Sequence, residues 1–234
     1  MKVLVTGHNG YVGRVLTKIL LEKKMDVVGC DINYFPTSFN EELDTIKNLN
    51  KDIRKISVED LENIDGVIHL AGLSNDPLGE LNPQLTHEIN FLSTVRLAKL
   101  SKEAGVERFL FSSSCSTYGK NSALVNEESN LEPLTEYAKS KVSSETEILS
   151  MADEKFCPTI LRNATVFGYS PGLRLDLVVN NLTASAFVTG KVKLLSDGTA
   201  WRPLLHVEDM SRAFLSIIES QVDSVKGEIF NVGN

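Results

Sequence analysis

Short apolar runs alternate with longer amphipathic segments along the first two thirds of the chain. Five runs rich in β-branched and other apolar residues predict buried strands, at residues 2–6, 26–30, 66–72, 107–113 and 158–162. The segments between them carry apolar residues at helical spacing, most clearly at residues 15–21, 85–105 and 136–151. This alternation predicts an α/β fold in which a doubly wound parallel sheet is covered by helices on both faces.

The pattern changes beyond about residue 165. It predicts an apolar helix at 175–189, a strand at 191–195 and a helix at 207–220. These elements no longer repeat a strand-helix unit, so we expect two domains. Residues 1–165 would form the parallel sheet, and residues 166–234 would form most of a smaller second domain.

Composition excludes several classes of protein. Hydrophobic residues make up 42% of the chain and charged residues 24%, as in ordinary globular proteins. A net charge of −7 speaks against nucleic acid as a partner, because phosphate backbones require clustered Lys and Arg. The three cysteines are scattered, so we expect neither a disulfide framework nor a metal site. The sequence has no early apolar stretch like a signal peptide and no apolar run near 18 residues, which predicts a cytoplasmic protein without a membrane partner.

A glycine-rich loop joins the first strand to the first helix. Gly7, Gly10 and Gly13 stand between them, which is the context of a dinucleotide-binding fingerprint. The glycines permit a tight turn and close approach of the backbone to a pyrophosphate, which the free N–H groups of the helix would bind. An ordinary turn is the alternative.

The second predicted strand ends in Asp31, 18 residues after Gly13. A carboxylate at this position can accept hydrogen bonds from both ribose hydroxyls and would repel a 2′-phosphate. No Arg follows directly to hold such a phosphate, so the sequence favours NAD over NADP. The alternative for Asp31 is a cap at the end of the strand.

Tyr137 and Lys141 stand four residues apart in a predicted helix, after the cluster Ser112-Ser113-Ser114. A nearby ammonium stabilises a phenolate and lowers a phenol pKa that is ordinarily about 10, which makes the pair a candidate acid/base. Ser114 would lie at the carboxyl end of its strand, where ligands bind in open α/β sheets. A solvated pair on a helix surface is the alternative.

Together these motifs resemble the extended short-chain dehydrogenase/reductase superfamily, in its NAD-dependent nucleotide-sugar epimerase/dehydratase branch. The resemblance extends over the whole chain in the segments 6–13, 69–72, 111–119, 137–141, 161–168 and 202–209, with Asp31, Asp52, Ile53 and Asn90. It implies a Rossmann-like sheet with a smaller, apparently incomplete C-terminal substrate domain. It also implies NAD as cofactor, a nucleotide sugar as substrate and a homodimer.

The resemblance assigns roles to particular residues. Tyr137 would be the acid/base, Lys141 would lower the Tyr137 pKa and bind the nicotinamide ribose, and Ser114 would orient the sugar hydroxyl. Besides Tyr137 and Lys141, the residues implied to bind cofactor are Gly7, Asn9, Gly10, Tyr11, Val12, Gly13, Asp31, Asp52, Ile53, Leu70, Ala71 and Gly72. Those implied to bind substrate are Ser114, Ser116, Asn163, Thr165 and Arg202.

Less specific alternatives remain for some of these residues. Ser114 would otherwise cap a turn or face the core, and Asn90, linked by the resemblance to the family's proton relay, would otherwise be an ordinary polar helix residue. Arg202, implied to clamp the nucleotide diphosphate, would otherwise form a surface salt bridge. His206 is expected to be structural.

Departures from the family pattern narrow the predicted reaction. Cys115 and Ser116 stand where sugar 4,6-dehydratases have an Asp-Glu pair, which disfavours dehydration. Thr165 stands where many epimerases have an asparagine that contacts the substrate phosphates. We also expect relatives to continue beyond the position of Asn234. The leading hypothesis is an NAD-dependent epimerase, with a nucleotide-ketosugar reductase or dehydrogenase second and a non-catalytic NAD-binding regulatory protein third.

Overall fold

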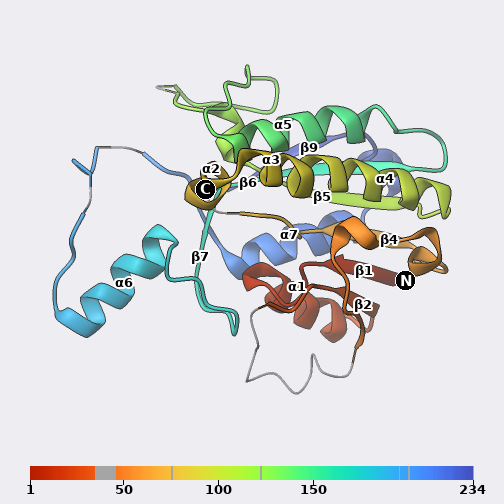
Figure 1. Cartoon of the computed structure of the whole chain (residues 1–234), viewed down its shortest axis with the longest axis horizontal. Coiled ribbons are helices and arrows are strands. Elements are labelled where there is room, and N and C mark those ends of the chain that lie inside the picture. The colour runs from red at the N-terminus through yellow and green to blue at the C-terminus, as the bar shows by residue number, and fades with distance from the viewer. Residues whose placement is uncertain (35–45, 75, 122, 195, 200, 234) are drawn as a thin grey trace.

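The central element is a seven-stranded sheet in which every pair of neighbouring strands is parallel. The computed structural model describes residues 1–34, 46–74, 76–121, 123–194, 196–199 and 201–233, apart from the side chains of residues 76–78. The strand order is β3-β2-β1-β4-β5-β6-β9 (Figure 1). The strands are β1 (Lys2–Thr6), β2 (Asp26–Cys30), β3 (Lys47–Leu49), β4 (Gly66–His69), β5 (Arg108–Ser114), β6 (Cys157–Asn163) and β9 (Ile229–Val232).

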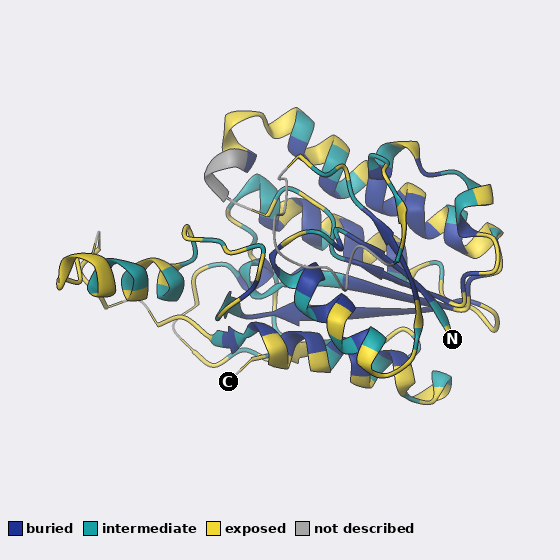
Figure 2. Ribbon diagram, turned by 90° about the horizontal axis from the view of Figure 1, so that it is seen from below, coloured by how far each residue is buried: buried dark blue, intermediate teal, exposed yellow. Residues whose placement is uncertain are grey.

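Helices cover both faces of this sheet, and Figure 2 shows their buried sides turned toward the strands. One layer contains α1 (Tyr11–Glu22) and α7 (Val207–Glu219), and the other contains α4 (Ser93–Glu103) and α5 (Glu136–Leu149). Successive side chains of a strand point to opposite faces. In β1, Val3 and Val5 accordingly pack in the first layer and Leu4 packs in the second. Strands buried on both faces explain the nearly continuous apolar runs in the sequence.

Shorter helical segments connect the main elements. The single helix predicted at residues 85–105 is instead a direct succession of α3 (Pro83–Thr86), the π-helical segment η4 (His87–Leu92) and α4, which ends at Glu103. Thr135 begins α5 by accepting a hydrogen bond from the backbone N–H of Ala138. The short segments are η2 (Ile53–Lys55), η3 (Val58–Leu61), α2 (Asp76–Leu81), α3 (Pro83–Thr86), η4 (His87–Leu92), η5 (Cys115–Tyr118) and η6 (Val222–Ser224).

A smaller group of elements lies beyond the carboxyl ends of the main strands. β7 (Thr165–Phe167) and β8 (Leu204–His206) form a separate two-stranded parallel sheet. Helix α6 (Val178–Thr189) has no buried residue, and it extends away from the main body in Figures 1 and 2. The predicted strand at 191–195 is wrong for residues 191–194, which are exposed and form no strand. An alternating pattern becomes a strand only where a neighbouring strand supplies hydrogen bonds, and none pairs with these residues.

Two elements of the range 166–234 belong to the main body. Strand β9 pairs with β6 in the large sheet, and α7 packs beside α1. Helix α7 is amphipathic and places Met210, Phe214 and Ile218 on one buried face. Among the elements described beyond residue 164, β7, α6 and β8 are therefore the ones that lie outside the large sheet and its helical layers.

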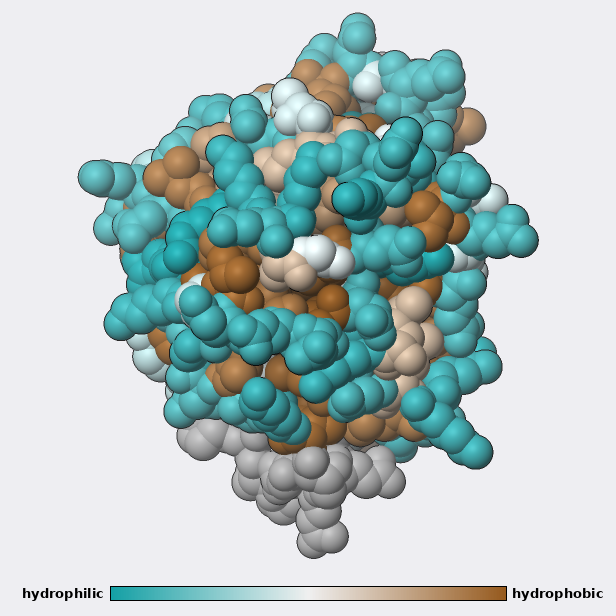
Figure 3. Space-filling view, turned by 90° about the vertical axis from the view of Figure 1, so that its right-hand side faces the viewer, coloured by the Kyte–Doolittle hydropathy of each residue, from teal (hydrophilic) through white to brown (hydrophobic). Residues whose placement is uncertain are grey.

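The face at the amino ends of the strands is shown in Figure 3. It is mostly hydrophilic, and its apolar residues form separate patches. No helix in the described part of the chain is long and apolar enough to cross a bilayer.

Removing the Phe214 ring tests whether α7 belongs to the main core. We expect Phe214→Ala to lower the free energy of unfolding by about 3–5 kcal/mol, because Phe214 is 0% exposed and its removal leaves a cavity. Phe187→Ala in α6 is the matched control, since Phe187 is 91% exposed and its truncation should change stability by less than about 0.5 kcal/mol. Equal effects of the two substitutions in urea denaturation would contradict this packing.

Candidate active site

The glycine loop lies against the end of β4. Gly7 has a φ of +74°, and a Cβ there would lie 2.9 Å from the backbone nitrogen of Ala71. A Cβ on Gly13 would lie 2.1 Å from the carbonyl oxygen of Gly7. Neither position can hold a side chain, so the backbone itself forms the surface at the start of α1. Gly10 precedes α1 and has no side chain to cap its first turn, which fits a loop whose N–H groups bind a phosphate.

Asp31, at the end of β2, faces this loop. Its carboxylate accepts hydrogen bonds from the backbone N–H groups of Asn9 at 3.2 Å and Asn33 at 2.9 Å. The Asn9 side chain donates to the Asn33 side chain at 2.5 Å. A carboxylate oxygen can accept two hydrogen bonds, so the Asp31 carboxylate can also accept hydrogen bonds from ribose hydroxyls. Val12, predicted to bind cofactor, lies partly buried in the first turn of α1.

Asp52 and Ile53 lie beyond β3. The Asp52 carboxylate accepts from the backbone N–H of Arg54 at 2.9 Å and from its guanidinium at 2.6 Å. These hydrogen bonds lower the pKa of Asp52. Ile53 is buried in the core layer that contains α4. Both residues have structural roles here that the sequence did not reveal.

The loop after β4 is fixed by Asn90. The Asn90 side chain accepts from the backbone N–H of Leu73 at 2.7 Å and donates to the Leu73 carbonyl at 2.8 Å. A Cβ on Gly72 would lie 2.9 Å from the Asn90 side-chain oxygen. Leu70 and Ala71 are partly buried and Gly72 is exposed, so Asn90 determines the path of the three predicted cofactor contacts.

Lys141 is buried against the sheet. Its Nζ donates to the carbonyl of Ser112 at 2.7 Å and lies 4.5 Å from the centre of the Phe111 ring and 5.5 Å from that of Tyr137. The residue is only 6% exposed, so the surface-pair alternative is wrong. Burial lowers the Lys141 pKa to about 8, although the charge of Glu145 acts in the opposite direction. An ammonium so placed titrates near neutral pH beside a phenol, which suits acid/base chemistry.

Ser114 is the last residue of β5, and it lies two residues after Ser112, the hydrogen-bond partner of Lys141. Its hydroxyl accepts hydrogen bonds from the backbone N–H of Ser116 at 3.2 Å and from the Ser116 hydroxyl at 2.9 Å. Ser114 therefore does cap η5, as the alternative expected. A hydroxyl also carries one proton to donate, so capping does not exclude contact with a ligand.

His69 supports the site from beneath. It is fully buried, with its two ring nitrogens 2.6 Å from the Thr6 hydroxyl and 2.8 Å from the Thr94 hydroxyl, and it stacks on Phe111. Burial, aided by the charge of Lys141, lowers the His69 pKa to about 3. His69 is therefore a neutral structural residue at physiological pH.

The segment after β7 lies over the glycine loop. The Tyr11 hydroxyl donates to the Gly168 carbonyl at 2.7 Å, and the Ser170 hydroxyl donates to the Tyr11 carbonyl at 2.6 Å. Arg174 donates to the Ser74 hydroxyl at 2.7 Å and so links this segment to the loop after β4. Arg174 and Ser74 could not be predicted from the sequence, because single polar residues in loops carry no pattern.

The predicted substrate residues occupy different environments. Ser116 and Thr165 are partly buried, and Arg202 is exposed. Burial raises the pKa of the Cys115 thiol and the charge of Arg202 opposes this shift, so Arg202 acts on the residue next to Ser114. Asn163 is buried and donates to Ser112 Oγ at 3.2 Å and to two backbone carbonyls. His206 caps α7 at its first turn, consistent with a structural role.

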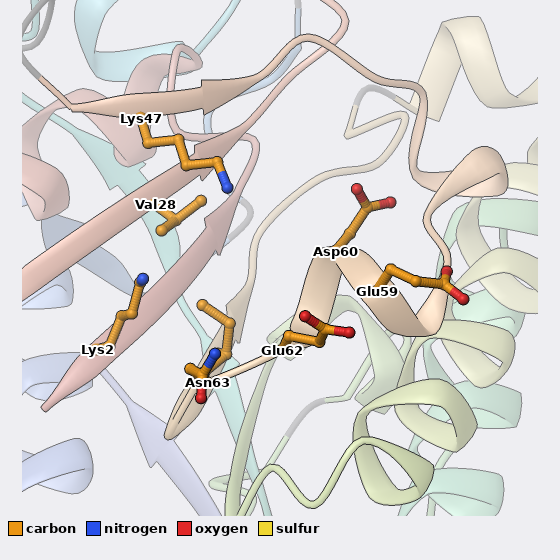
Figure 4. A pocket seen from close by; sticks show the side chains of 8 residues that line it. Lys2, Val28, Lys47, Glu59, Asp60, Glu62 and Asn63 are labelled. Carbon is orange, nitrogen blue, oxygen red and sulfur yellow. The ribbon is translucent and has the colours of Figure 1, made fainter.

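The pocket in Figure 4 lies elsewhere. It is a polar hollow near the amino ends of the strands, and its lining residues are Lys2, Val28, Lys47, Glu59, Asp60, Glu62, Asn63 and Ile64. None of the predicted catalytic or binding residues contributes to it. The candidate site is the convergence of the glycine loop, Asp31, Ser114, Tyr137 and Lys141 at the carboxyl ends of β1, β2 and β5.

Fold and site together define a dinucleotide-binding α/β protein with a tyrosine-lysine pair. A model of the NAD dependent epimerase/dehydratase family matches residues 3–233, and the chain belongs to this family. It is 29% identical to an uncharacterized UDP-glucose epimerase, YtcB, of Bacillus subtilis (strain 168), over all of this chain and 77% of that protein. It is 28% identical to a UDP-glucose 4-epimerase of Lactobacillus helveticus, over all of this chain and 76% of that protein.

Solved structures of similar proteins share the fold. MoeE5 in complex with UDP-glucuronic acid and NAD superposes with a TM-score of 0.88 at 30% identity, covering all of this chain and 77% of MoeE5. TunA, an NAD-dependent NDP-hexosamine 5,6-dehydratase involved in tunicamycin biosynthesis, has a TM-score of 0.88 at 26% identity, covering all of this chain and 75% of TunA. The Rossmann-like, doubly wound sheet predicted from the sequence is therefore confirmed.

Burial of Lys141 has a measurable consequence for stability. Folding lowers its pKa from 10.5 to about 8, a difference equivalent to about 3 kcal/mol. Below pH 8 the folded protein holds a buried ammonium and bears this penalty in full. Between pH 8 and 10.5 the folded state releases its proton before the unfolded state does, so stability attributable to Lys141 rises with pH.

We therefore expect Lys141→Met to be more stable than wild type by about 1–3 kcal/mol at pH 7. The difference should shrink from pH 8 upward and vanish above about pH 10.5. Denaturant unfolding of both proteins from pH 6 to 11 measures it. A constant difference over this range would show that Lys141 is not a buried ammonium.

Proposed function

We propose that the chain is an NAD-dependent nucleotide-sugar epimerase and that its substrates are UDP-sugars. The observation that carries this proposal is the Tyr137–Lys141 pair, with Lys141 buried on the sheet side of α5 close to the Ser114 strand. The family match and the two similar UDP-glucose epimerases support the reaction and the nucleotide. MoeE5, which binds NAD together with a UDP-sugar, supports the pairing of cofactor and substrate.

The proposed chemistry divides between cofactor and protein. Bound NAD would supply the hydride chemistry, accepting a hydride from one sugar carbon and giving it back. Tyr137 removes the proton from the hydroxyl on that carbon, and the Lys141 ammonium stabilises the resulting phenolate. Ser114 donates a hydrogen bond to the same sugar oxygen and orients it. If the ketosugar turns before Tyr137 returns the proton, the product is the epimer.

Proposed cofactor contacts follow the geometry of the loops. The backbone of Gly7–Gly13, including Asn9, Tyr11 and Val12, would hold the pyrophosphate at the start of α1. Asp31 would accept from the adenosine ribose, and Leu70, Ala71 and Gly72 would pass close to the cofactor. Asp52 and Ile53 would border the adenine, with Asp52 held in place by Arg54.

Residues 165–206 would provide most of the surface that binds the nucleotide sugar. Thr165 and Arg202 stand on this part of the chain, and Ser116 stands beside Ser114. Arg202 is exposed and has the planar donor geometry that suits a diphosphate. Asn163 would act by holding the ends of β5 and β6 together behind Ser114.

Two broader expectations accompany this proposal. A homodimer would form through α5 and the preceding helical layer, as the family resemblance implies. A cytoplasmic location would agree with three free cysteines, which a reducing compartment keeps unpaired.

Cofactor preference tests the role of Asp31. We expect the wild-type protein to bind NAD at least about 10-fold more tightly than NADP, because the Asp31 carboxylate would repel a 2′-phosphate. Asp31→Asn removes the negative charge of the carboxylate, so the NADP and NAD dissociation constants of this variant should differ by a smaller factor. Titration calorimetry with both cofactors measures the four dissociation constants. Similar dissociation constants for NAD and NADP in the wild-type protein would contradict the proposed contact between Asp31 and the cofactor ribose.

Turnover tests the reaction. Purified protein with catalytic NAD and a panel of UDP-, dTDP- and GDP-sugars should produce a new epimer by proton NMR, without net absorbance at 340 nm. Absorbance that rises in proportion to conversion would establish a dehydrogenase instead. Silence across the panel in protein that binds NAD would count against catalysis.

Tyr137→Phe should reduce kcat by about 10²–10⁴-fold, because the acid/base hydroxyl is lost. Its affinity for NAD should remain within about twofold of wild type. Tyr169→Phe is the matched control, since Tyr169 is 78% exposed and its hydroxyl should not matter. Full turnover by Tyr137→Phe would contradict the proposed mechanism.

A further inference from the structure

A buried ion pair lies one helical turn beyond Lys141. Glu145 of α5 and Arg162 of β6 are both buried, and their side chains are each 3% exposed. The Arg162 guanidinium donates to both carboxylate oxygens, with Nη2 2.7 Å from Oε2 and Nε 3.2 Å from Oε1. The Ser113 hydroxyl also donates to Glu145 Oε1. The Glu145 carboxylate is therefore held from two strands at once.

This carboxylate fixes α5 at the point where β5 carries its functional residues. Ser112 accepts the Lys141 hydrogen bond, Ser113 binds Glu145, and Ser114 follows as the predicted substrate contact. Helix α5 is thus attached to two consecutive residues of β5. Because Tyr137 lies on the same helix, these two bonds set its position relative to Ser114.

Arg162 has further hydrogen-bond partners besides Glu145. Arg162 donates to the Tyr118 hydroxyl at 2.9 Å and to the Glu127 carbonyl at 3.2 Å. Tyr118 in turn donates to the Asn231 side chain at 2.6 Å. Arg162 therefore binds Glu145 through Nε and Nη2, and binds Tyr118 and Glu127 through Nη1.

The charges around Lys141 leave Glu145 as its electrostatic partner. From β5 come the Phe111 ring and the Ser112 carbonyl, from β4 the neutral His69, and from α5 Tyr137 and Glu145. Within the described part of the chain, the charge that favours protonated Lys141 is that of Glu145, four residues further along α5. An ammonium removed from water needs such a partner to remain charged.

We propose that Glu145 is a positioning residue for the Tyr137–Lys141 pair, and that its clamped carboxylate keeps the buried ammonium charged and fixes α5 against β5. This role rests on the proposed function of Tyr137 and Lys141. A buried ion pair is by itself weak evidence for added stability, because desolvation offsets the attraction. If Glu145 controls the charge of Lys141, replacing Glu145 must change the pH at which Lys141 titrates.

The test compares the pH at which Lys141 titrates in four variants. Glu145→Gln leaves the positive Arg162 without its partner, and Glu145→Gln with Arg162→Met removes both charges. Glu145→Asp retains the carboxylate, and Ser113→Ala retains the charge of Glu145 but removes one of its hydrogen bonds. Two readouts are used: the alkaline limb of turnover, and the pH dependence of unfolding measured with and without Lys141→Met in each background.

We expect Glu145→Gln to move the Lys141 titration down by about one pH unit or more, because it removes the negative charge four residues from Lys141 on α5 and leaves Arg162 positive. In the variant with both Glu145→Gln and Arg162→Met, Lys141 should titrate at a pH between those of Glu145→Gln and wild type. If Glu145→Gln does not fold, this double variant is compared with wild type instead. Glu145→Asp and Ser113→Ala should stay near wild type. Reduced turnover with an unmoved titration in all variants would overturn the proposal and leave a structural ion pair.

Failure of the proposed function is distinguishable from failure of this inference. Absence of turnover in wild type would remove the epimerase assignment. The unfolding readout requires no substrate, so it still decides whether Glu145 controls the charge of Lys141.

Discussion

The site depends on an ammonium buried against the central sheet. Lys141 exchanges water for a backbone carbonyl, an aromatic face and the field of a nearby carboxylate. Desolvation makes this arrangement unfavourable for folding, and the same desolvation makes the charge effective on a neighbouring phenol. Stability and chemistry are therefore opposed at this position, as is common where a pKa is tuned for catalysis.

Parallel strand topology brings the remaining groups to this ammonium. The carboxyl ends of β1, β2, β4 and β5 lie along one edge, so the glycine loop, Asp31, the Leu70–Gly72 loop and Ser114 meet there. Side-chain contacts then fix each loop, with Asn90 holding the loop after β4 and Arg174 linking it to the segment above the glycine loop. The sheet determines the location of the site, and these contacts determine its detailed shape.

Features encoded within one short stretch could be predicted from the sequence. The strand, glycine loop and first helix are contiguous, and Tyr137 and Lys141 share a helix, so local spacing was enough to find them. Contacts between distant segments could not be predicted in this way. Glu145 meets Ser113 and Arg162 only after α5, β5 and β6 have packed. The contact between Asp52 and Arg54 is local, but it forms in a turn that carries no strong pattern. The predicted strand is incorrect at residues 191–194 for the same reason, because alternation does not reveal whether a pairing strand exists.

The most direct test of the central claim follows one hydrogen atom through the reaction. A nucleotide sugar deuterated at the carbon that inverts is incubated with the protein and catalytic NAD in ordinary water, and the product is analysed by mass spectrometry and NMR. Our account predicts an inverted product that retains the deuterium at the same carbon, because hydride leaves and returns within one bound complex. Replacement of the deuterium by solvent hydrogen would contradict it and indicate inversion by proton abstraction from carbon.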